Sequence, residues 1–154
     1  MSTLKEQLRT DLTTAIKARD ELTSSTLRMA LTAVTNEEVS GKEARTLSDD
    51  DILLVLGREA KKRREAATAF DDAGRAELAD RERAELTVLD AYLPAQLEQA
   101  EIDAIIDGAV AAAAADGKSG MAAMGAVMKL VTPQVQGRAD GGAVAAAVRA
   151  RLAG

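Results

Sequence analysis

Residues 48–74 of the chain read SDDDILLVLGREAKKRREAATAFDDAG, and this stretch has the start, the period and the end of one long helix. Ser48 is a favourable N-cap residue, and the aspartates at 49–51 fall in the first turn, where the helix dipole favours negative charge. Gly74 is the residue type that ends helices. The pattern therefore predicts a helix from about residue 49 to residue 72. Its period places five side chains inward, namely Leu53, Leu56, Ala60, Ala67 and Phe70.

The segments on both sides of this helix also have helical periods, and none alternates as a half-buried strand does. Before it, we predict a helix that starts near Thr3, where Glu6 has capping-box spacing, and another from about Asp20 to Ser40-Gly41. After it, we predict a charged helix with inward leucines and a solvated face. The inward leucines are Leu78, Leu86, Leu89 and Leu93, and the solvated face carries Arg81, Arg83 and Glu85. These four helices form the N-terminal part of an all-α fold.

Tyr92-Leu93-Pro94 marks the predicted domain boundary, because the residue before a proline is disfavoured in the helical conformation. We therefore divide the chain into an N-terminal helical domain, residues 1–94, and a C-terminal domain, residues 95–154. The C-terminal part is rich in Ala and Gly, whose small side chains let helices approach closely. We expect a compact three-helix module there.

The three C-terminal helices are predicted from their apolar periods at about 99–115, 120–131 and 140–152. Ser119 and Asp140 are the expected N-caps of the last two helices, and Thr132-Pro133 is expected to end the middle one. The methionines at 121, 124 and 128 have helical spacing, and we expect them to fill the core rather than to form a partner groove.

The composition excludes several classes of enzyme. The 154 residues include no Cys, no His and no Trp, and only one Tyr and one Phe. Without Cys or His, the chain alone cannot form a Ser-His or Cys-His catalytic triad or a cysteine-bound metal site. The scarcity of aromatic side chains excludes RNA recognition by stacking of bases on a row of aromatic residues. With 20 basic against 25 acidic residues and a net charge of −5, any contact with a polyanion has to come from a local patch.

The basic run Lys61-Lys62-Arg63-Arg64 has two interpretations. It could bind phosphate, since Arg suits bidentate contacts. We favour the other interpretation, a solvated helix face on which Lys61 pairs with Glu65. Helix geometry spreads the four residues around the cylinder, so they do not form one flat patch. Arg63 falls in register with the inward residues, and we expect its stem to lie between helices or domains.

Two further segments invite the same comparison between a structural and a binding role. Asp116-Gly117-Lys118-Ser119-Gly120 resembles a phosphate loop superficially, but Ala112 stands where the Walker pattern needs Gly. We expect a turn there, with an exposed Lys118 that could meet an anion weakly. In Gly137-Arg138-Ala139-Asp140-Gly141, the turn explains most residues, and Arg138 has no evident local partner.

Four sequence features together resemble the GatB/YqeY family over essentially the whole chain. They are Leu27-Arg28 through Asn36-Glu37-Glu38; Lys61-Lys62-Arg63-Arg64-Glu65-Ala66 with Phe70, Ala73-Gly74-Arg75 and Leu78; Glu85-Leu86 through Tyr92-Leu93-Pro94 and Leu97; and Met124-Gly125-Ala126-Val127-Met128-Lys129 with Gly137-Arg138-Ala139-Asp140-Gly141. Glu98 departs from the family, which often has a Ser or Thr helix cap at this position. The resemblance implies an all-α fold with a four-helix part followed by a small three-helix part.

The resemblance also implies a function. The same module forms the tail of the B subunit of the glutamine-dependent amidotransferase that amidates misacylated Glu-tRNA and Asp-tRNA, a carbon–nitrogen ligase with glutamine as amido-N-donor. It is also appended to some glutaminyl-tRNA synthetases, and in both settings the tail is understood to contact tRNA away from the chemistry. The catalytic part of the B subunit has no counterpart here, so we expect this chain not to catalyse the reaction alone.

The leading hypothesis is therefore a stand-alone tRNA-binding accessory module. Its candidate phosphate contacts are Lys61, Lys62, Arg64, Arg75, Lys118, Lys129 and Arg138. The alternative is a protein-interaction module that docks on an amidotransferase or an aminoacyl-tRNA synthetase, which an acidic surface suits at least as well. We expect no cofactor, no metal site, no membrane span and a cytoplasmic location.

Overall fold

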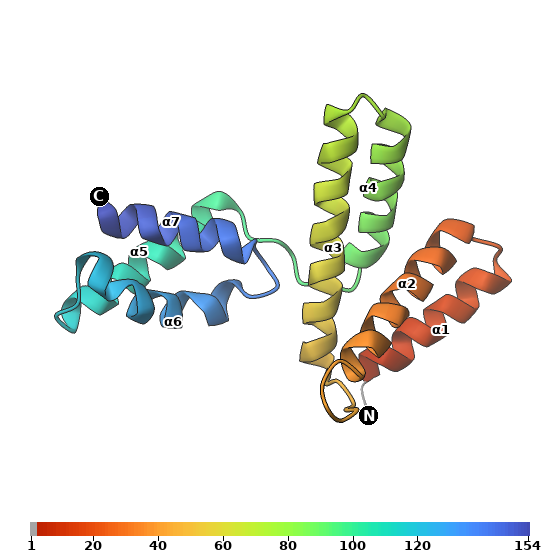
Figure 1. The fold of residues 1–154 in the computed structure, drawn as a ribbon, viewed down its shortest axis with the longest axis horizontal. Coiled ribbons are helices and arrows are strands. Elements are labelled where there is room, and N and C mark those ends of the chain that lie inside the picture. The colour runs from red at the N-terminus through yellow and green to blue at the C-terminus, as the bar shows by residue number, and fades with distance from the viewer. Residues whose placement is uncertain (1–2) are drawn as a thin grey trace. The chain divides into compact units, whose positions relative to one another are not determined.

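The computed structural model describes residues 3–154, which form seven α-helices, one short 3-10 helix and no strand (Figure 1). The chain divides after Leu93 into two units, and each unit has its own hydrophobic core. Four α-helices precede the division and three follow it, so the predicted all-α class and its helix order are confirmed.

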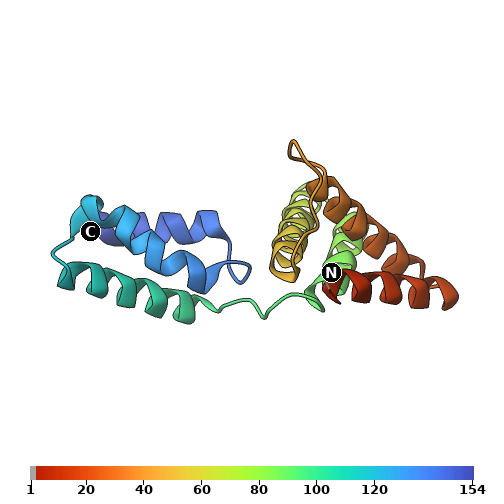
Figure 2. The ribbon, with the colours of Figure 1, turned by 90° about the horizontal axis from the view of Figure 1, so that it is seen from below.

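The N-terminal unit consists of two helical hairpins. Its helices are α1 (Thr3–Lys17), α2 (Glu21–Glu38), α3 (Asp49–Asp72) and α4 (Ala76–Asp90). α1 runs beside α2, and α3 beside α4, and α2 also packs on both α3 and α4 (Figures 1 and 2). Each helix contributes one leucine of at most 1% exposure to the shared core, namely Leu8, Leu27, Leu56 and Leu89.

The bounds of α3 agree with the prediction because both of its ends are determined locally. Ser48 Oγ accepts a hydrogen bond from the Asp51 N–H at 3.1 Å, and the Asp51 carboxylate accepts one from the Ser48 N–H at 3.2 Å, which completes a capping box. At the other end Gly74 has a φ of 72°, the left-handed conformation expected there.

The first turn of α1 is capped by a different residue from the one predicted. Asp49, from the start of α3, accepts hydrogen bonds from the Thr3 hydroxyl at 2.7 Å and from the Leu4 N–H at 3.1 Å. Thr3 is thus the first described helical residue and donates its hydroxyl proton to Asp49. This contact joins two helix N-termini that are far apart in sequence.

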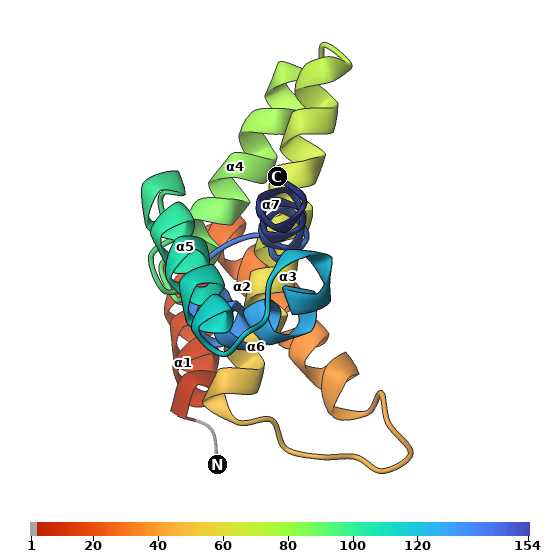
Figure 3. The ribbon, with the colours of Figure 1, turned by 90° about the vertical axis from the view of Figure 1, so that its left-hand side faces the viewer.

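α2 ends at Glu38, before the predicted Ser40-Gly41. The last carbonyls are satisfied by the following segment: Ser40 Oγ donates to the Glu37 carbonyl at 2.8 Å, and the Arg45 N–H donates to the Glu38 carbonyl at 2.9 Å. Figure 3 shows the segment of residues 39–48 as an extended connection between α2 and α3. A returning backbone amide therefore replaces the predicted glycine cap.

The inward faces of α3 and α4 differ in part from the prediction. Ile52 and Val55 are buried, whereas the predicted Leu53 and Phe70 are only half-buried. The reason is that α3 packs on α1 and α2 as well as on α4, which widens its buried stripe. Glu85 is not on a solvated face: it is 8% exposed and pairs with two arginines.

The C-terminal unit packs three helices and a 3-10 turn around a core of small aliphatic residues. Its elements are α5 (Gln99–Ala115), η1 (Gly120–Ala123), α6 (Met124–Val135) and α7 (Gly141–Ala153). Among the aliphatic side chains larger than alanine, the most deeply buried come from all three α-helices, namely Ile106, Val127, Val131, Val144 and Val148. Asp140 accepts a hydrogen bond from the Gly142 N–H at 3.0 Å, so its predicted N-cap role is confirmed.

Two predictions about the middle helix of this unit are wrong. Pro133 lies inside α6 instead of ending it, because Val135 continues the four-residue spacing of Val127 and Val131 and is itself 4% exposed. Met121 falls in η1 and is 48% exposed, so it does not fill the core, whereas Met124 and Met128 do pack against it.

The start of α5 is capped at Glu98 without Ser or Thr, since the Glu101 carboxylate accepts a hydrogen bond from the Glu98 N–H at 3.0 Å.

Candidate functional site

The three candidate phosphate contacts in the basic run on α3 already have carboxylate partners. Each has an acidic partner within 4.0 Å: Lys61 with Glu65 (4.0 Å), Lys62 with Glu59 (3.2 Å) and Arg64 with Asp90 (3.7 Å). Such exposed pairs contribute up to about 1 kcal/mol to stability. The partners also reduce the positive potential that a phosphate would meet, so this run is a weak anion site.

Arg63 points into the N-terminal unit, as its register predicts. Its side chain is 14% exposed, and its guanidinium lies near three carboxylates: Glu85 (3.1 Å), Glu82 (3.6 Å) and Glu59 (3.7 Å). Burial raises the pKa of the Glu82 carboxyl, the charge of Glu85 raises it further, and Arg63 opposes both. Arg63 therefore balances buried negative charge between α3 and α4.

Arg75 stands at the N-cap position of α4 and is exposed. Its Nε lies 3.4 Å from Glu77 Oε1, so it too has a carboxylate partner. None of the four candidate cations of the N-terminal unit is thus free of an acidic neighbour.

Lys118 and Lys129 differ from these residues. Lys118 lies in the turn between α5 and η1, where Gly117 (φ 80°) and Gly120 (φ 63°) are left-handed, and Lys129 lies on α6. Both are exposed, and neither has a salt bridge or side-chain hydrogen bond within residues 3–154. The predicted turn at 116–120 is confirmed.

Arg138 is not the free residue that its sequence surroundings suggest. It is half-buried, its Nε donates a hydrogen bond to the Ala95 carbonyl at 3.2 Å, and its own carbonyl accepts one from the Leu97 N–H at 2.8 Å. Arg138 thus lies near the start of α5, whereas Lys118 follows its end. A 17-residue helix is about 25 Å long, so these two candidates do not share one site.

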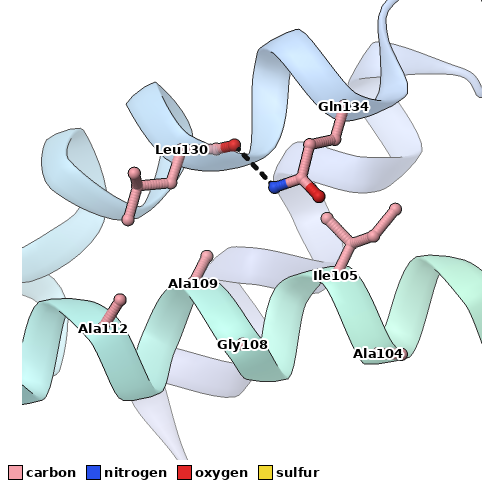
Figure 4. Close-up of a pocket in the computed structure, with 7 residues that line it drawn as sticks. All are labelled: Ala104, Ile105, Gly108, Ala109, Ala112, Leu130 and Gln134. Atoms are coloured by element: carbon pink, nitrogen blue, oxygen red, sulfur yellow. Dashed lines mark hydrogen bonds between the residues drawn. The ribbon is translucent and has the colours of Figure 1, made fainter.

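The C-terminal unit also carries a shallow apolar groove of about 360 Å³ between α5 and α6 (Figure 4). Ala104, Gly108 and Ala112 form its α5 side at four-residue spacing, and Leu130, which is 44% exposed, lies opposite them on α6. A Cβ added at Gly108 would meet no atom within 4 Å, so the groove is open at this point. In the sequence, the four-residue spacing of small residues on α5 is the pattern that indicates this groove.

Several exposed cations without an acidic partner lie outside the predicted set. Among residues 3–154 they are Lys17, Arg19, Arg28, Lys42 and Arg149. Sequence reasoning missed them because pairing depends on distant residues: Arg81, for example, reaches Glu21, sixty positions away. Whether a cation has an acidic partner is therefore determined by the tertiary structure and not by its neighbours in sequence.

No group of three acidic side chains within residues 3–154 is arranged to hold a metal ion. No helix of residues 3–154 is both long and apolar enough to cross a membrane.

Comparison with known proteins places these features in a family. The YqeY-like protein family matches residues 5–152, which include most of both units. A curated protein of Schizosaccharomyces pombe, described as uncharacterized protein C22F3.15, is 33% identical over 91 residues, covering 59% of this chain and 72% of the yeast protein. On the extent of the family match, this chain belongs to the YqeY-like protein family.

Proposed function

We propose that this protein is a stand-alone accessory module that binds tRNA through its sugar–phosphate backbone. The observation that carries the proposal is the pair of exposed, unpaired lysines Lys118 and Lys129 in the C-terminal unit of residues 3–154. The resemblance of this unit to the tail of the tRNA amidotransferase B subunit supports the same role. Because the chain has one Tyr, one Phe and no Trp, recognition rests on charge and shape rather than on base stacking.

Backbone binding of this kind has a measurable signature. Each phosphate neutralised by a lysine releases counterions, so affinity falls with salt, and the slope of log K against log salt steepens by about 0.9 per contact in duplex nucleic acid. Lysines that already share their charge with a carboxylate release fewer counterions. We therefore expect Lys118 and Lys129 to contribute more to the slope than the paired lysines of α3.

The test compares two variants that change the net charge equally. The double variant K118E/K129E should lower the affinity for purified tRNA at least tenfold and reduce the salt slope by about two. The matched control K61E/K62E reverses two lysines that each have an acidic partner within 4.0 Å, and it should change affinity less. No binding of the unmodified protein to tRNA at low micromolar concentration and low salt would contradict the proposal, as would equal losses in the two variants.

A second candidate function is a protein-interaction module that docks on an amidotransferase or an aminoacyl-tRNA synthetase. The apolar groove between α5 and α6 favours it, since exposed apolar surface commonly serves protein binding. G108L adds an apolar side chain at a groove position where a Cβ meets no atom within 4 Å, and G125L places the same side chain on α6 outside the groove residues. Loss of co-purification of such an enzyme from nuclease-treated lysate in G108L, but not in G125L, would support this function.

A further inference from the structure

The turn between α1 and α2 contains a conformational exception. Arg19 has a φ of 58°, and it is the only residue other than glycine with positive φ within residues 3–154. The Arg19 N–H donates to the Ile16 carbonyl at 3.1 Å, and the Asp20 N–H donates to the Ala15 carbonyl at 2.9 Å. These two bonds form the helix-ending motif in which the left-handed residue is usually glycine. The turn therefore keeps a large cationic side chain where glycine would be less strained.

The charges around this turn are not neutralised by pairing. Lys17 and Arg19 are exposed and have no acidic partner among the described residues. The carboxylate of the neighbouring Asp20 caps the first turn of α2, because it accepts hydrogen bonds from the Thr23 N–H at 3.1 Å and from the Thr23 hydroxyl at 2.7 Å. The Glu21 carboxylate accepts two hydrogen bonds from the Arg81 guanidinium, both at 3.3 Å. The two cations are therefore available to an external anion.

An ordinary structural role explains only part of this arrangement. Lys17 lies in the last turn of α1, where a cation interacts favourably with the helix dipole. That role does not require Arg at position 19, because a glycine would end the helix with less strain. Residues in sparsely populated backbone conformations recur at functional sites, and a binding role would account for Arg rather than Gly at position 19.

We propose that the α1–α2 turn is a second contact for the phosphate backbone of tRNA, with Lys17 and Arg19 as the contacting residues. The inference rests on the proposed function and extends it to the N-terminal unit. A guanidinium suits this role, because its donors can contact two phosphate oxygens together. The exposure of Ile16 (47%) next to the turn leaves room for a large partner to approach.

The decisive variant is R19G, because stability and binding should change in opposite directions. Glycine relieves the left-handed conformation, so the melting temperature should rise by about 4 °C. Removal of one phosphate contact should weaken tRNA binding several-fold and reduce the salt slope by about one. R19K keeps the charge and the strain, so it should retain most of the binding at an unchanged melting temperature.

A matched control separates this site from the general effect of net charge. K42A also removes one exposed, unpaired cation from the N-terminal unit, but outside the turn, and it should leave binding nearly unchanged. If the unmodified protein binds tRNA, loses binding in K118E/K129E and keeps it in R19G, this inference is wrong and the proposed function stands. Equal losses in R19G and K42A would also overturn it. If the unmodified protein does not bind tRNA, both proposals fail.

Discussion

Replacement of Arg63 by methionine tests how the buried charges of the N-terminal unit are balanced. Methionine keeps an apolar stem of similar length but removes the guanidinium that faces Glu59, Glu82 and Glu85 at 3.1–3.7 Å. At such distances one ion pair has a Coulomb energy of about 5 kcal/mol at an effective dielectric constant of about 20. Desolvation of the arginine offsets much of this energy, and removal of one member of a buried pair typically costs about 3–5 kcal/mol. We expect R63M to lower the unfolding free energy by about 3 kcal/mol.

The assay can be confined to the N-terminal unit. Tyr92 is the only tyrosine, the chain has no tryptophan, and Tyr92 packs against the core of this unit. Urea unfolding followed by tyrosine fluorescence therefore reports the unit that contains Arg63. The matched control is R64M, which removes the adjacent arginine from an exposed pair with Asp90 and should cost less than about 1 kcal/mol.

The pH dependence supplies a second readout for R63M. Without the arginine, the three carboxylates repel one another, and the pKa of Glu82, which burial already raises, rises further. A carboxyl pKa above its unfolded value means that the folded state binds the proton more tightly, so stability increases as the pH falls. The deficit of R63M relative to the unmodified protein should shrink between pH 7 and pH 5. A loss equal to that of R64M, or a deficit that grows on acidification, would show that Arg63 does not balance the buried carboxylates.

Three further predictions concern single side chains. E82Q removes a carboxylate whose raised pKa makes its ionised form costly in the folded state. The free energy of unfolding in urea should therefore rise by about 1 kcal/mol at pH 7, and this gain should disappear as the pH falls through the folded pKa. Y92F removes the hydrogen bond from the Tyr92 hydroxyl to Asp11 at 2.5 Å and should cost about 1.5 kcal/mol by thermal unfolding. Because burial and Asp11 raise the pKa of Tyr92, the unmodified protein should also lose stability above about pH 10, and Y92F should lose less. P133A restores a backbone donor inside α6 and should raise the unfolding free energy by about 1 kcal/mol or more, measured by circular dichroism.

The fold was predictable from sequence wherever an element's ends are determined by neighbouring residues. Ser48 directly precedes α3 and Gly74 follows its last residue by two positions, and the bounds of the helix follow from them. The end of α2 could not be found in this way, because the amide that satisfies the Glu38 carbonyl comes from Arg45, across an extended segment. Pro133 locally predicts the end of α6, but the helix continues to Val135, whose burial stabilises the last turn.

The candidate site was less predictable, because the availability of a cation depends on contacts between distant segments. Arg138 has no partner nearby in sequence, yet its side chain donates to the carbonyl of Ala95, forty-three positions earlier. Glu85 has the spacing of a surface residue, but Arg63 of another helix holds it in the interior. Lys118 is exposed as predicted, and Lys129 is exposed as well. Sequence reasoning did not single out Arg19, because Arg is not the residue type expected in a left-handed turn.

We propose that unpaired lysines of the C-terminal unit bind the tRNA backbone. A titration of purified tRNA with the unmodified protein and with K118E/K129E, over a series of salt concentrations, tests this role. We predict that the unmodified protein binds at low micromolar concentration in low salt, and that the double variant binds at least tenfold more weakly, with a salt slope smaller by about two. The same affinity and the same slope for the two proteins would contradict the claim.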